Sequence, residues 1–478
     1  MDHKVETAAD IPLVVDVDGT LIKVDSLQEA FVQLLAKQPW TALRVLSVLR
    51  DGRAPFKAAL ANHSFPDVTT LPFDEKVLSA IKEARAKGRK VYLATAADNR
   101  FAKAIATAVG DIDGIFASDG KTNLKGIAKA ERLVAAFGDR GFDYIGNSKT
   151  DLPIWRAARN VLVTGAPSRV VKSLNRQQLA PHVLRVRGTN AFTYLKALRP
   201  HQWLKNALLF LPALAGHAFN EQTLVPALVA FISFSLGASS IYLINDMVDL
   251  PHDRAHPEKR HRPFASGTIP VSHGALIFAL ILGISLSLSL LLPPMFLVAL
   301  AGYLCLAMSY SLYLKQKLMV DVVALAALYG IRVLAGSAVT GIVLSQWLAG
   351  FCFFIFLSLA LMKRTTEIIL LPETSEDKVK GRGYRRGDLA VLNALTVASG
   401  FVGVLVLALY INSPDVMTLY RRPDLLWGIC IALVYWLGRA FFLTGRGEMR
   451  QDPVIFAATD RNSLLTGILI IVLFVAAI

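Results

Sequence analysis

The spacing of apolar positions changes once along the chain, near residue 199. Before that point, short apolar runs such as 13–15 and 91–93 alternate with charge-bearing stretches of helical periodicity. Strands that alternate with helices predict a parallel sheet with helices on its faces. We therefore expect an α/β domain over residues 1–190.

After that point apolar stretches dominate, and several reach about 20 residues, the length at which a helix crosses a bilayer core of roughly 30 Å. Nine spans are predicted, near residues 206–218, 223–244, 273–292, 295–312, 319–337, 344–362, 389–411, 425–443 and 463–478. The first of these is short. Residues 191–478 are therefore expected to form an all-α, nine-helix transmembrane domain.

The composition agrees with a membrane protein. Of the 478 residues, 54% are hydrophobic and 18% are charged, which is too apolar for an ordinary soluble enzyme. The net charge of +15 could indicate nucleic-acid binding, but a hydrophobic chain uses basic residues against anionic lipid, so no nucleic-acid partner is expected. The three cysteines lie inside apolar runs, and neither disulfides nor structural zinc are expected.

The basic residues also predict an orientation, because Lys and Arg near the ends of spans are retained in the cytoplasm. The loops after the second, fourth, sixth and eighth predicted spans carry 17 Lys and Arg residues, whereas the opposite loops carry 2. We therefore expect a multi-pass protein of the cell (inner) membrane, with the N-terminal domain and the polar loops in the cytoplasm. The sequence does not predict an oligomeric state.

Two carboxylates close the first apolar strand of the α/β half. Asp16 and Asp18 are two residues apart and precede a Gly-Thr turn. Alternation along a strand places both on one side at its carboxyl end, where open α/β sheets bind ligands. Such a pair can hold Mg²⁺ while one carboxylate attacks phosphorus and the other handles the proton. The simpler alternative is a turn with two solvated acids.

Three further motifs follow in order, and with them residues 11–165 resemble the haloacid dehalogenase (HAD) phosphohydrolase superfamily. The resemblance implies a HAD-like, Rossmannoid fold in which Asp16 is the nucleophile and Asp18 the general acid/base. It implies that Thr95, which ends the strand VYLAT, binds phosphate. Lys125 is implied as the lysine that neutralises the phosphate, and Lys129 is the open alternative.

The last HAD-like motif departs from the family's pattern, which usually has Gly-Asp where this chain has Gly-Asn at Asn147. By the resemblance, Asn147 and Asp151 join Asp16 and Asp18 as metal ligands, but the amide removes one negative charge. Phosphatase activity is expected, with a catalytically weak or regulatory domain as the alternative. Residues 22–90 are expected to form a helical cap that shapes substrate choice.

A series of acidic residues marks the end of the second predicted span. Asp246, Asp249 and Asp253 are three and four residues apart, so on a helix they share one face. Acids at a span end are costly unless they have a function, and this spacing suits a Mg²⁺ ion that carries a diphosphate. A solvated loop that fixes topology would explain the basic residues that follow, but not the acids in register.

Residues 194–478 resemble the UbiA superfamily of intramembrane transferases, in which nine helices surround a central cavity. The resemblance rests on the pattern NDxxDxxxD followed by RPxxSG, on a basic entry segment and on a second polar loop. It implies metal ligands at Asn245, Asp246, Asp249, Asp253 and Asp321, and phosphate contacts from Lys205, Lys259, Arg260, Arg262, Lys315 and Arg332.

Two departures from typical aromatic prenyltransferases resemble the decaprenyl-phosphate phosphoribosyltransferase branch. The second motif offers one aspartate, Asp321, in place of a DxxxD pair, and the first motif continues into a basic run over 256–263. That branch transfers 5-phosphoribose from phosphoribosyl diphosphate to a polyprenyl phosphate. Lys363-Arg364 and Glu367 after the sixth span, and Asp452-Pro453 with Asp460-Arg461 before the ninth, fit the branch as well, although ordinary span anchors would look the same.

The expected function is therefore Mg²⁺-dependent transfer from a diphosphate donor, phosphoribosyl diphosphate, to a polyprenyl lipid, with a HAD domain that could dephosphorylate the product. The first alternative is a UbiA-type aromatic prenyltransferase of isoprenoid quinone biosynthesis. The second is a membrane transporter or lipid-binding protein with a regulatory domain, which would leave the acidic register unexplained. Isoprenoid length is not predicted.

Overall fold

The computed structural model describes the chain except for residues 1–10, 187, 189, 372–378, 380 and 450–451. The described residues form two compact units. The first unit runs to Leu198 and also contains Tyr242–Phe278, and the second contains Arg199–Ile241 and Ala279–Ile478. The segment with the acidic series, expected in the transmembrane domain, therefore belongs to the same compact unit as the α/β domain.

A six-stranded parallel sheet forms the centre of the first unit, in the order β3-β2-β1-β4-β5-β6. The strands are β1 (Leu13–Val15), β2 (Val91–Asp98), β3 (Gly114–Ser118), β4 (Asp143–Gly146), β5 (Val161–Ala166) and β6 (His182–Val186). The expected α/β fold with a parallel sheet is confirmed. Because β1 lies between β2 and β4, the residues that follow these three strands meet at one edge of the sheet.

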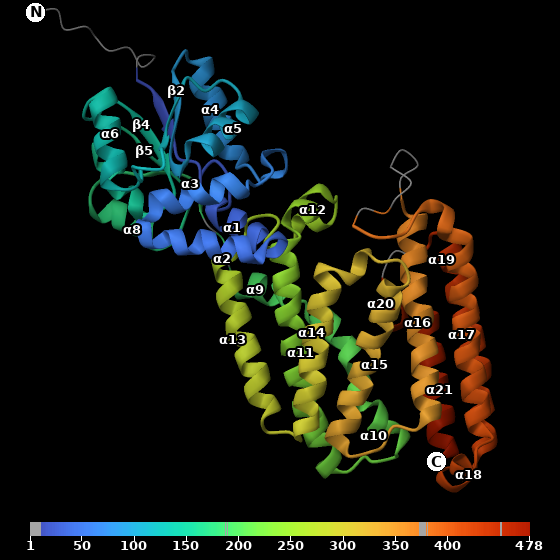
Figure 1. Cartoon of the computed structure of the whole chain (residues 1–478). Coiled ribbons are helices and arrows are strands. Elements are labelled where there is room, and N and C mark those ends of the chain that lie inside the picture. Colours follow the sequence, from blue (N-terminus) through green and yellow to red (C-terminus); the bar gives the residue numbers. More distant parts are fainter. Residues whose placement is uncertain (1–10, 187, 189, 372–378, 380, 450–451) are drawn as a thin grey trace, which may run out of the picture. The chain divides into compact units, whose positions relative to one another are not determined.

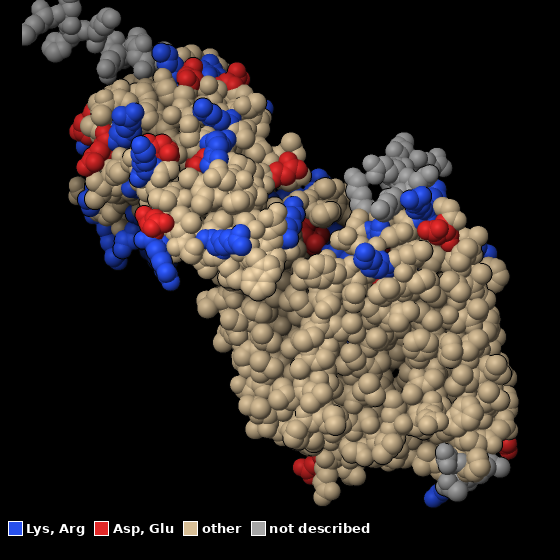
Figure 2. Space-filling view, in the orientation of Figure 1, with Lys and Arg blue, Asp and Glu red and all other residues tan. Residues whose placement is uncertain are grey.

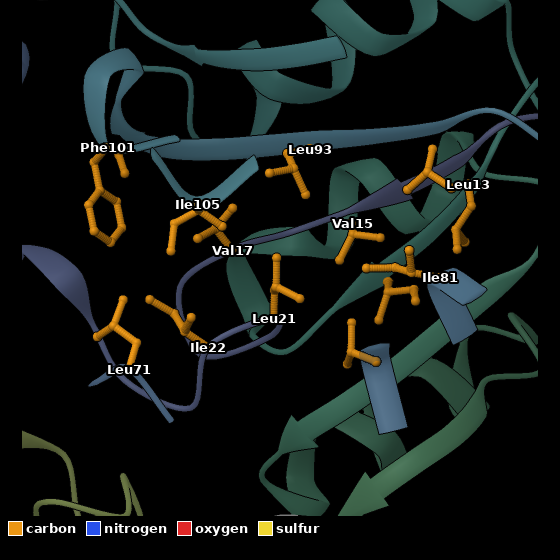
Figure 3. Close-up of a cluster of buried hydrophobic side chains, with 14 of the residues drawn as sticks. Leu13, Val15, Val17, Leu21, Ile22, Leu71, Ile81, Leu93, Phe101 and Ile105 are labelled. Carbon is orange, nitrogen blue, oxygen red and sulfur yellow. The ribbon is translucent and has the colours of Figure 1, made fainter. Parts of the chain in front are cut away.

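Helices cover both faces of this sheet. On one face, α4 (Glu75–Ala86) and α5 (Asn99–Val109) pack over Leu13 and Val15 (Figure 3). On the other face, α6 (Ile127–Phe137), α7 (Leu152–Ala157) and α8 (Ser168–Arg176) pack over Val14. Successive residues of β1 thus enter opposite cores, as the alternation of a strand requires.

The insertion between β1 and β2 is helical, and it divides into two parts. The helices α1 (Ser26–Lys37), α2 (Pro39–Ser47) and α3 (Arg53–His63) share a small core of their own and lie beside one another (Figure 1). Asp25 caps α1 by accepting a hydrogen bond from the Gln28 amide, and Pro39 opens α2. α4 instead joins the core of the sheet. We call α1–α3, together with residues 64–66 that follow α3, the cap.

Seven helices of the described residues are long and apolar enough to cross a membrane. They are α11 (Glu221–Val248), α13 (Val271–Ser289), α14 (Pro294–Leu312), α15 (Val320–Thr340), α16 (Gln346–Ile369), α17 (Leu389–Ile411) and α19 (Leu426–Gly445). A pair bent by 80°, α20 (Pro453–Thr459) with α21 (Arg461–Ala477), would make an eighth span. In Figure 2 a broad uncharged band covers the helices of the second unit, with the charged side chains near their ends.

The structure does not confirm nine spans. Two predicted spans are not among the seven long helices: the last, residues 463–478, lies in α21 of the bent pair, and the first, residues 206–218, lies in a region without a long helix. This region forms a 3₁₀ helix, Pro200–Phe210, followed by the five-residue α10 (Leu211–Ala215). Pro212 has no backbone N–H to continue a helical ladder, and it lies in the first turn of α10. The shorter helices left are α9 (Ala191–Ala197), α12 (Leu250–Ala255) and α18 (Pro414–Leu419).

We call Tyr242–Phe278, which carries Asp246, Asp249 and Asp253, the acidic segment. Within the first unit, it packs on the cap through a buried ion pair. The Glu29 side chain on α1 is fully buried, and its two carboxylate oxygens accept hydrogen bonds from Arg254 on α12 at 2.8 and 2.5 Å. Nearby, the Ser272 amide donates to the Gln28 side chain at 3.0 Å. Gly267 fits tightly against Lys23, where a Cβ would lie 2.9 Å from the lysine Cβ. The cap therefore forms part of the support of this segment.

We expect Glu29→Ala to loosen the acidic segment, because Arg254 would keep a buried charge without its partner, at a cost of about 3–5 kcal/mol. Hydrogen exchange of residues 250–267 in the detergent-solubilised chain should accelerate. Replacing both members of the pair with Met should restore much of the protection, since a buried apolar pair carries no such penalty. Glu75→Ala, at an exposed position on α4, is the matched control. Unchanged exchange in Glu29→Ala would contradict the supporting role.

Candidate active sites

The first candidate site is a cavity of about 340 Å³ at the carboxyl ends of β1, β2 and β4. Its lining from the sheet side includes Asp16, Asp18, Ala96, Ala97, Asp98, Asn147 and Asp151. The cap closes the opposite side with Leu27, Lys57, Leu60 and Phe65, among others. The cavity therefore has a polar floor made by strand ends and a mainly apolar wall made by the cap.

Asp16 is buried and held from two directions. Its Oδ1 accepts a hydrogen bond from the Lys129 Nζ at 2.7 Å, and its Oδ2 accepts one from the Thr20 hydroxyl at 3.2 Å. Lys129 also donates to the Ala94 carbonyl and the Tyr144 hydroxyl. Burial raises the pKa of Asp16 from 3.8 to about 6, although the charge of Lys129 opposes that rise. Asp16 is thus fixed in place with its charge only partly compensated.

Asp18 has a different environment. Its Oδ1 accepts a hydrogen bond from the Ser26 amide at the start of α1, at 2.8 Å. Burial raises the pKa of Asp18 from 3.8 to about 7, and the negative charges of Asp25 and Asp16 act in the same direction. A carboxyl group with this pKa can both give and take a proton near neutral pH. The two carboxylates therefore differ in their partners, since Asp16 is paired with Lys129 and Asp18 accepts from a backbone amide.

Asp151 shapes the loop after β4. Its Oδ2 accepts hydrogen bonds from the backbone amides of Asn147 and Ser148 at 3.1 and 2.9 Å, and its Oδ1 accepts one from the Tyr144 hydroxyl. The Asn147 side chain lies directly over Gly19, where a Cβ would come within 2.0 Å of the amide nitrogen. Asp151 thus holds Asn147 beside the turn that follows Asp16 and Asp18.

The oxygen donors of this cavity fit a divalent cation. Among the described residues, no three His, Cys, Asp or Glu side chains converge on one metal position. Asp16, Asp18 and the Asn147 amide nevertheless line a single cavity, and Mg²⁺ prefers such oxygen ligands. The raised pKa values of both acids show that their negative charge lacks full compensation there, which a bound cation would supply.

Two of the sequence-predicted phosphate contacts are placed differently from expectation. The lysine on the nucleophile is Lys129, whereas Lys125 is exposed and lines the cavity. Thr95 is fully buried, and its hydroxyl accepts a hydrogen bond from the Ala97 amide at 3.0 Å. The cavity wall at the end of β2 starts one residue later, so the structure does not bring Thr95 into the cavity.

Lys57 is a cavity residue that the sequence analysis did not predict. It extends from α3 across the cavity and donates to the Ala96 carbonyl at 2.5 Å and to the Asn123 side chain at 2.7 Å. Burial lowers its pKa from 10.5 to about 8. No local motif surrounds Lys57, and only the fold of the cap brings it to the strand ends.

The second candidate site is the acidic segment of the first unit. Arg262 donates to Asp253 at 2.7 Å and to Asp246 at 3.2 Å, and both carboxylates are buried. Both acids thus contact one arginine, but Asp246 lies on α11 and Asp253 on α12, so they do not share a face of one continuous helix. Asp249 begins α12, and its amide donates to the Asn245 carbonyl at 2.8 Å. Two further predicted phosphate ligands, Lys259 and Arg260, are exposed on a short 3₁₀ turn.

Asp321, predicted as a metal ligand, lies in an ion network of the second unit. It is fully buried at the start of α15, and both of its oxygens accept hydrogen bonds from Arg364 on α16, at 2.5 and 3.2 Å. The Tyr310 hydroxyl donates to Asp321 at 2.8 Å. Arg364 also contacts Glu367, and Arg382 lies 3.5 Å from Asp321. A buried acid needs a counter-charge, and here Arg364 provides it.

A third group of charges surrounds Asp452, just before α20. Its Oδ2 accepts hydrogen bonds from Lys205 at 2.9 Å and Lys363 at 3.1 Å. Although burial alone would raise the pKa of Asp452, the charges of Lys363 and Lys205 hold it well below its usual range. Lys205 also lines an apolar cavity of about 400 Å³ with no other charged residue in its lining.

The remaining predicted phosphate ligands lie outside these groups. Arg332 is buried in the second unit, donates to the Asn206 side chain at 2.8 Å and lies 4.8 Å from the centre of the Tyr303 ring. Lys315 is half-buried on the short turn Leu314–Gln316. Arg332 thus has a protein partner in place of a phosphate, and its predicted role stays a prediction.

Comparison with known proteins agrees with this division. Residues 207–383 match the UbiA prenyltransferase family, and residues 13–156 match the haloacid dehalogenase-like hydrolases. The uncharacterized protein y4nM of Sinorhizobium fredii is 35% identical over 470 residues, which cover 98% of this chain and 91% of that protein. The chain belongs to a family that joins a HAD domain to a UbiA domain. The recognition of both superfamilies from sequence is confirmed.

Two other relatives concern the UbiA domain. A decaprenyl-phosphate phosphoribosyltransferase of Corynebacterium glutamicum is 37% identical over 185 residues, which are 38% of this chain and 56% of that enzyme. The structure of a UbiA homologue from Archaeoglobus fulgidus bound to GPP and Mg²⁺ is 18% identical, covers 60% of this chain and 98% of that one, and has a TM-score of 0.46. The UbiA match and the seven long apolar helices identify a multi-pass membrane protein.

The raised pKa values in the HAD cavity predict a pH-dependent stability of the metal-free chain. An acid whose pKa is higher in the folded state stabilises the fold below its unfolded pKa of 3.8, and that contribution is lost as pH rises through about 6 and about 7. With a chelator present, the melting temperature of the HAD domain should therefore fall across this window.

Asp18→Asn should flatten the fall in melting temperature, because the amide does not ionise, and added Mg²⁺ should stabilise the wild-type chain most above pH 7. The readout is fluorescence melting in detergent of a chain whose other five tryptophans are replaced by Phe, so that the signal comes from the buried Trp155 in the core of the sheet. Glu131→Gln, at an exposed position on α6, serves as the control. Equal pH slopes in Asp18→Asn and the wild-type chain would contradict the raised pKa of Asp18.

Proposed function

We propose that the UbiA domain is a Mg²⁺-dependent transferase that moves 5-phosphoribose from phosphoribosyl diphosphate to a polyprenyl phosphate. The observation that carries this proposal is the acidic segment, where Arg262 bridges the buried carboxylates of Asp246 and Asp253. Such a group combines ligands for a metal-bound diphosphate with a cation for further phosphate oxygens. The identity to a decaprenyl-phosphate phosphoribosyltransferase, 37% over 185 residues, supports this choice of donor and acceptor.

In this reaction the bond between C1 of the ribose and the diphosphate breaks, and a phosphate oxygen of the lipid forms the new bond to C1. Asp246, Asp249 and Asp253 would hold Mg²⁺, which when bound supplies stabilisation of the leaving diphosphate. Arg262 would turn from the carboxylates toward the phosphates of the donor, with the exposed Lys259 and Arg260 beside it. A 5-phosphate on the donor needs more cations than an isoprenoid tail does.

The acceptor requires an apolar path that ends near positive charge. The cavity beside Lys205 supports this, because its lining is apolar apart from that lysine, and Lys363 lies on the same carboxylate. Asp452 would keep the two ammonium groups together until a lipid phosphate competes for them. We include in this proposal that the substrates enter from the cytoplasmic leaflet of the cell membrane, because 17 basic residues are predicted on that side.

We further propose that the HAD domain hydrolyses a phosphate ester, for which the 5-phosphate of the transferase product is the candidate. Asp16 would attack phosphorus while Asp18 gives its proton to the leaving ester oxygen. Asp18 would then accept a proton from the water that hydrolyses the aspartyl phosphate and frees inorganic phosphate. Lys129, 2.7 Å from Asp16, orients the nucleophile, and Asn147 would complete the oxygen ligands of Mg²⁺.

For the transferase, Asp246→Asn or Asp249→Asn should lower the rate roughly hundredfold or more, because the loss of a metal ligand removes several kcal/mol of charge stabilisation. The assay supplies radiolabelled phosphoribosyl diphosphate, a polyprenyl phosphate and Mg²⁺ to the purified chain. Glu258→Gln, an exposed acid of the same segment, should leave the rate unchanged.

A parallel reaction with a prenyl diphosphate and 4-hydroxybenzoate tests the choice of donor. Product only in that second reaction would overturn the phosphoribosyl proposal and leave an aromatic prenyltransferase. No Mg²⁺-dependent product in either reaction would favour a transporter or lipid-binding protein.

For the HAD domain, Asp16→Asn should abolish hydrolysis of phosphate esters and leave the transfer largely intact, because the amide is no nucleophile. Asp18→Asn should slow the reaction and remove the dependence of the rate on a group that titrates near pH 7. Both are measured as phosphate release by the full chain with Mg²⁺. If the wild-type chain hydrolyses no phosphate ester, Asn147 has disabled the site and a regulatory role takes its place.

A further inference from the structure

The cap presents an apolar face that no other part of the described chain covers. Five large side chains from fifteen consecutive residues are exposed: Leu35 at 44%, Trp40 at 77%, Leu43 at 52%, Leu46 at 43% and Leu49 at 48%. They make up five of the eight exposed large apolar side chains described between residues 11 and 186. Apolar side chains gathered in this way mark an interaction surface, whereas scattered ones would not. We call these five residues the cap face.

The cap face follows from the spacing of residues on α2. Trp40, Leu43 and Leu46 recur every third residue and lie outward, whereas Ala42 and Val45 between them are buried against the core of the cap. The 3₁₀ turn Val48–Asp51 continues the same interval to Leu49. The outward side chains are therefore unnecessary for folding the cap, and their exposure has to be explained by something else.

Positive charge surrounds the cap face. Lys37, Arg44, Arg50 and Arg53 are exposed between and beside the apolar residues, and Asp51 is the one acid within residues 35–53. Tryptophan and leucine within a border of lysine and arginine suit the interface of a bilayer, where the rings enter the headgroup layer and the cations meet anionic lipid. The membrane helices of the same chain keep a bilayer within reach at all times.

We infer that α2 and the turn after it dock on the surface of an anionic bilayer and hold the HAD cavity open to esters carried by lipid. The same cap supplies the apolar wall of that cavity through Leu27, Leu60 and Phe65. If the alcohol part of a phosphate ester is amphipathic, the phosphate would lie at the strand ends and the alcohol part would lie along this wall. The docking itself is independent of the proposed function, whereas the choice of a lipid-borne ester rests on it.

Spin labels on the full chain in lipid nanodiscs test the docking. The chain is first freed of native thiols by Cys305→Ala, Cys352→Ala and Cys430→Ala, and then labelled at Leu43→Cys or, as the control, at Glu131→Cys on α6. In nanodiscs with phosphatidylglycerol, the label at position 43 should collide with oxygen and be shielded from a water-soluble nickel complex. The control label should be fully accessible to nickel. Adding Arg44→Glu and Arg50→Glu should expose the label at 43, and Arg132→Glu should not.

Three outcomes would overturn the inference. A label at 43 that is as accessible to nickel as the control shows a free surface. Shielding that is equal in detergent and in nanodiscs shows that protein covers the face. Dipolar broadening between labels at 43 shows that a second copy of the chain is the occupant.

Hydrolysis then tests the lipid-borne ester. Trp40→Ser with Leu43→Ser should lower kcat/KM at least tenfold for a phosphate ester anchored in vesicles, and leave that for a water-soluble ester unchanged. Equal loss on both esters would overturn the role of docking in substrate choice. If the wild-type chain hydrolyses neither ester, the proposed phosphatase activity fails, while the spin labels still decide whether the cap docks.

Discussion

A buried charge must meet an opposite charge, and this constraint organises every site in the chain. Asp16 meets Lys129, Asp321 meets Arg364, and the carboxylates of the acidic segment meet Arg262. Removing such groups from water costs several kcal/mol per ion unless a partner repays it. In each of these three cases an arginine or lysine of the chain supplies that partner.

The fold of the first half could be read from the sequence because its signals are local. A short apolar run such as Leu13–Val15 predicts a strand, and the alternation of a strand predicts which of the two cores each side chain enters. Asp16 and Asp18 follow that strand directly, so their place at its carboxyl end needed no knowledge of the rest of the chain. Asp246 and Asp253 are also close in sequence, and the turn between α11 and α12 brings both to a common partner, Arg262.

What the sequence could not supply depends on contacts between distant segments. Lys129 lies on the nucleophile because it belongs to the buried side of α6, whereas Lys125 precedes that helix and is exposed. Lys57 enters the cavity only through the packing of the cap. The first predicted membrane span is not confirmed for a different reason: hydropathy records how apolar residues 206–218 are, but not that they form a 3₁₀ helix followed by a short α-helix that Pro212 opens. From the sequence alone, Arg364 could equally be a basic residue that anchors the end of a span. The structure shows that it pairs with Asp321.

The ion pair between Glu29 and Arg254 joins residues separated by 225 positions of sequence. One belongs to the cap of the HAD domain and the other follows the acidic series of the UbiA domain by a single residue. The two enzymatic modules are therefore not interchangeable parts. If a different HAD domain replaced this one, Arg254 would stay buried without the carboxylate of Glu29. Positions 29 and 254 are therefore expected to vary together or not at all.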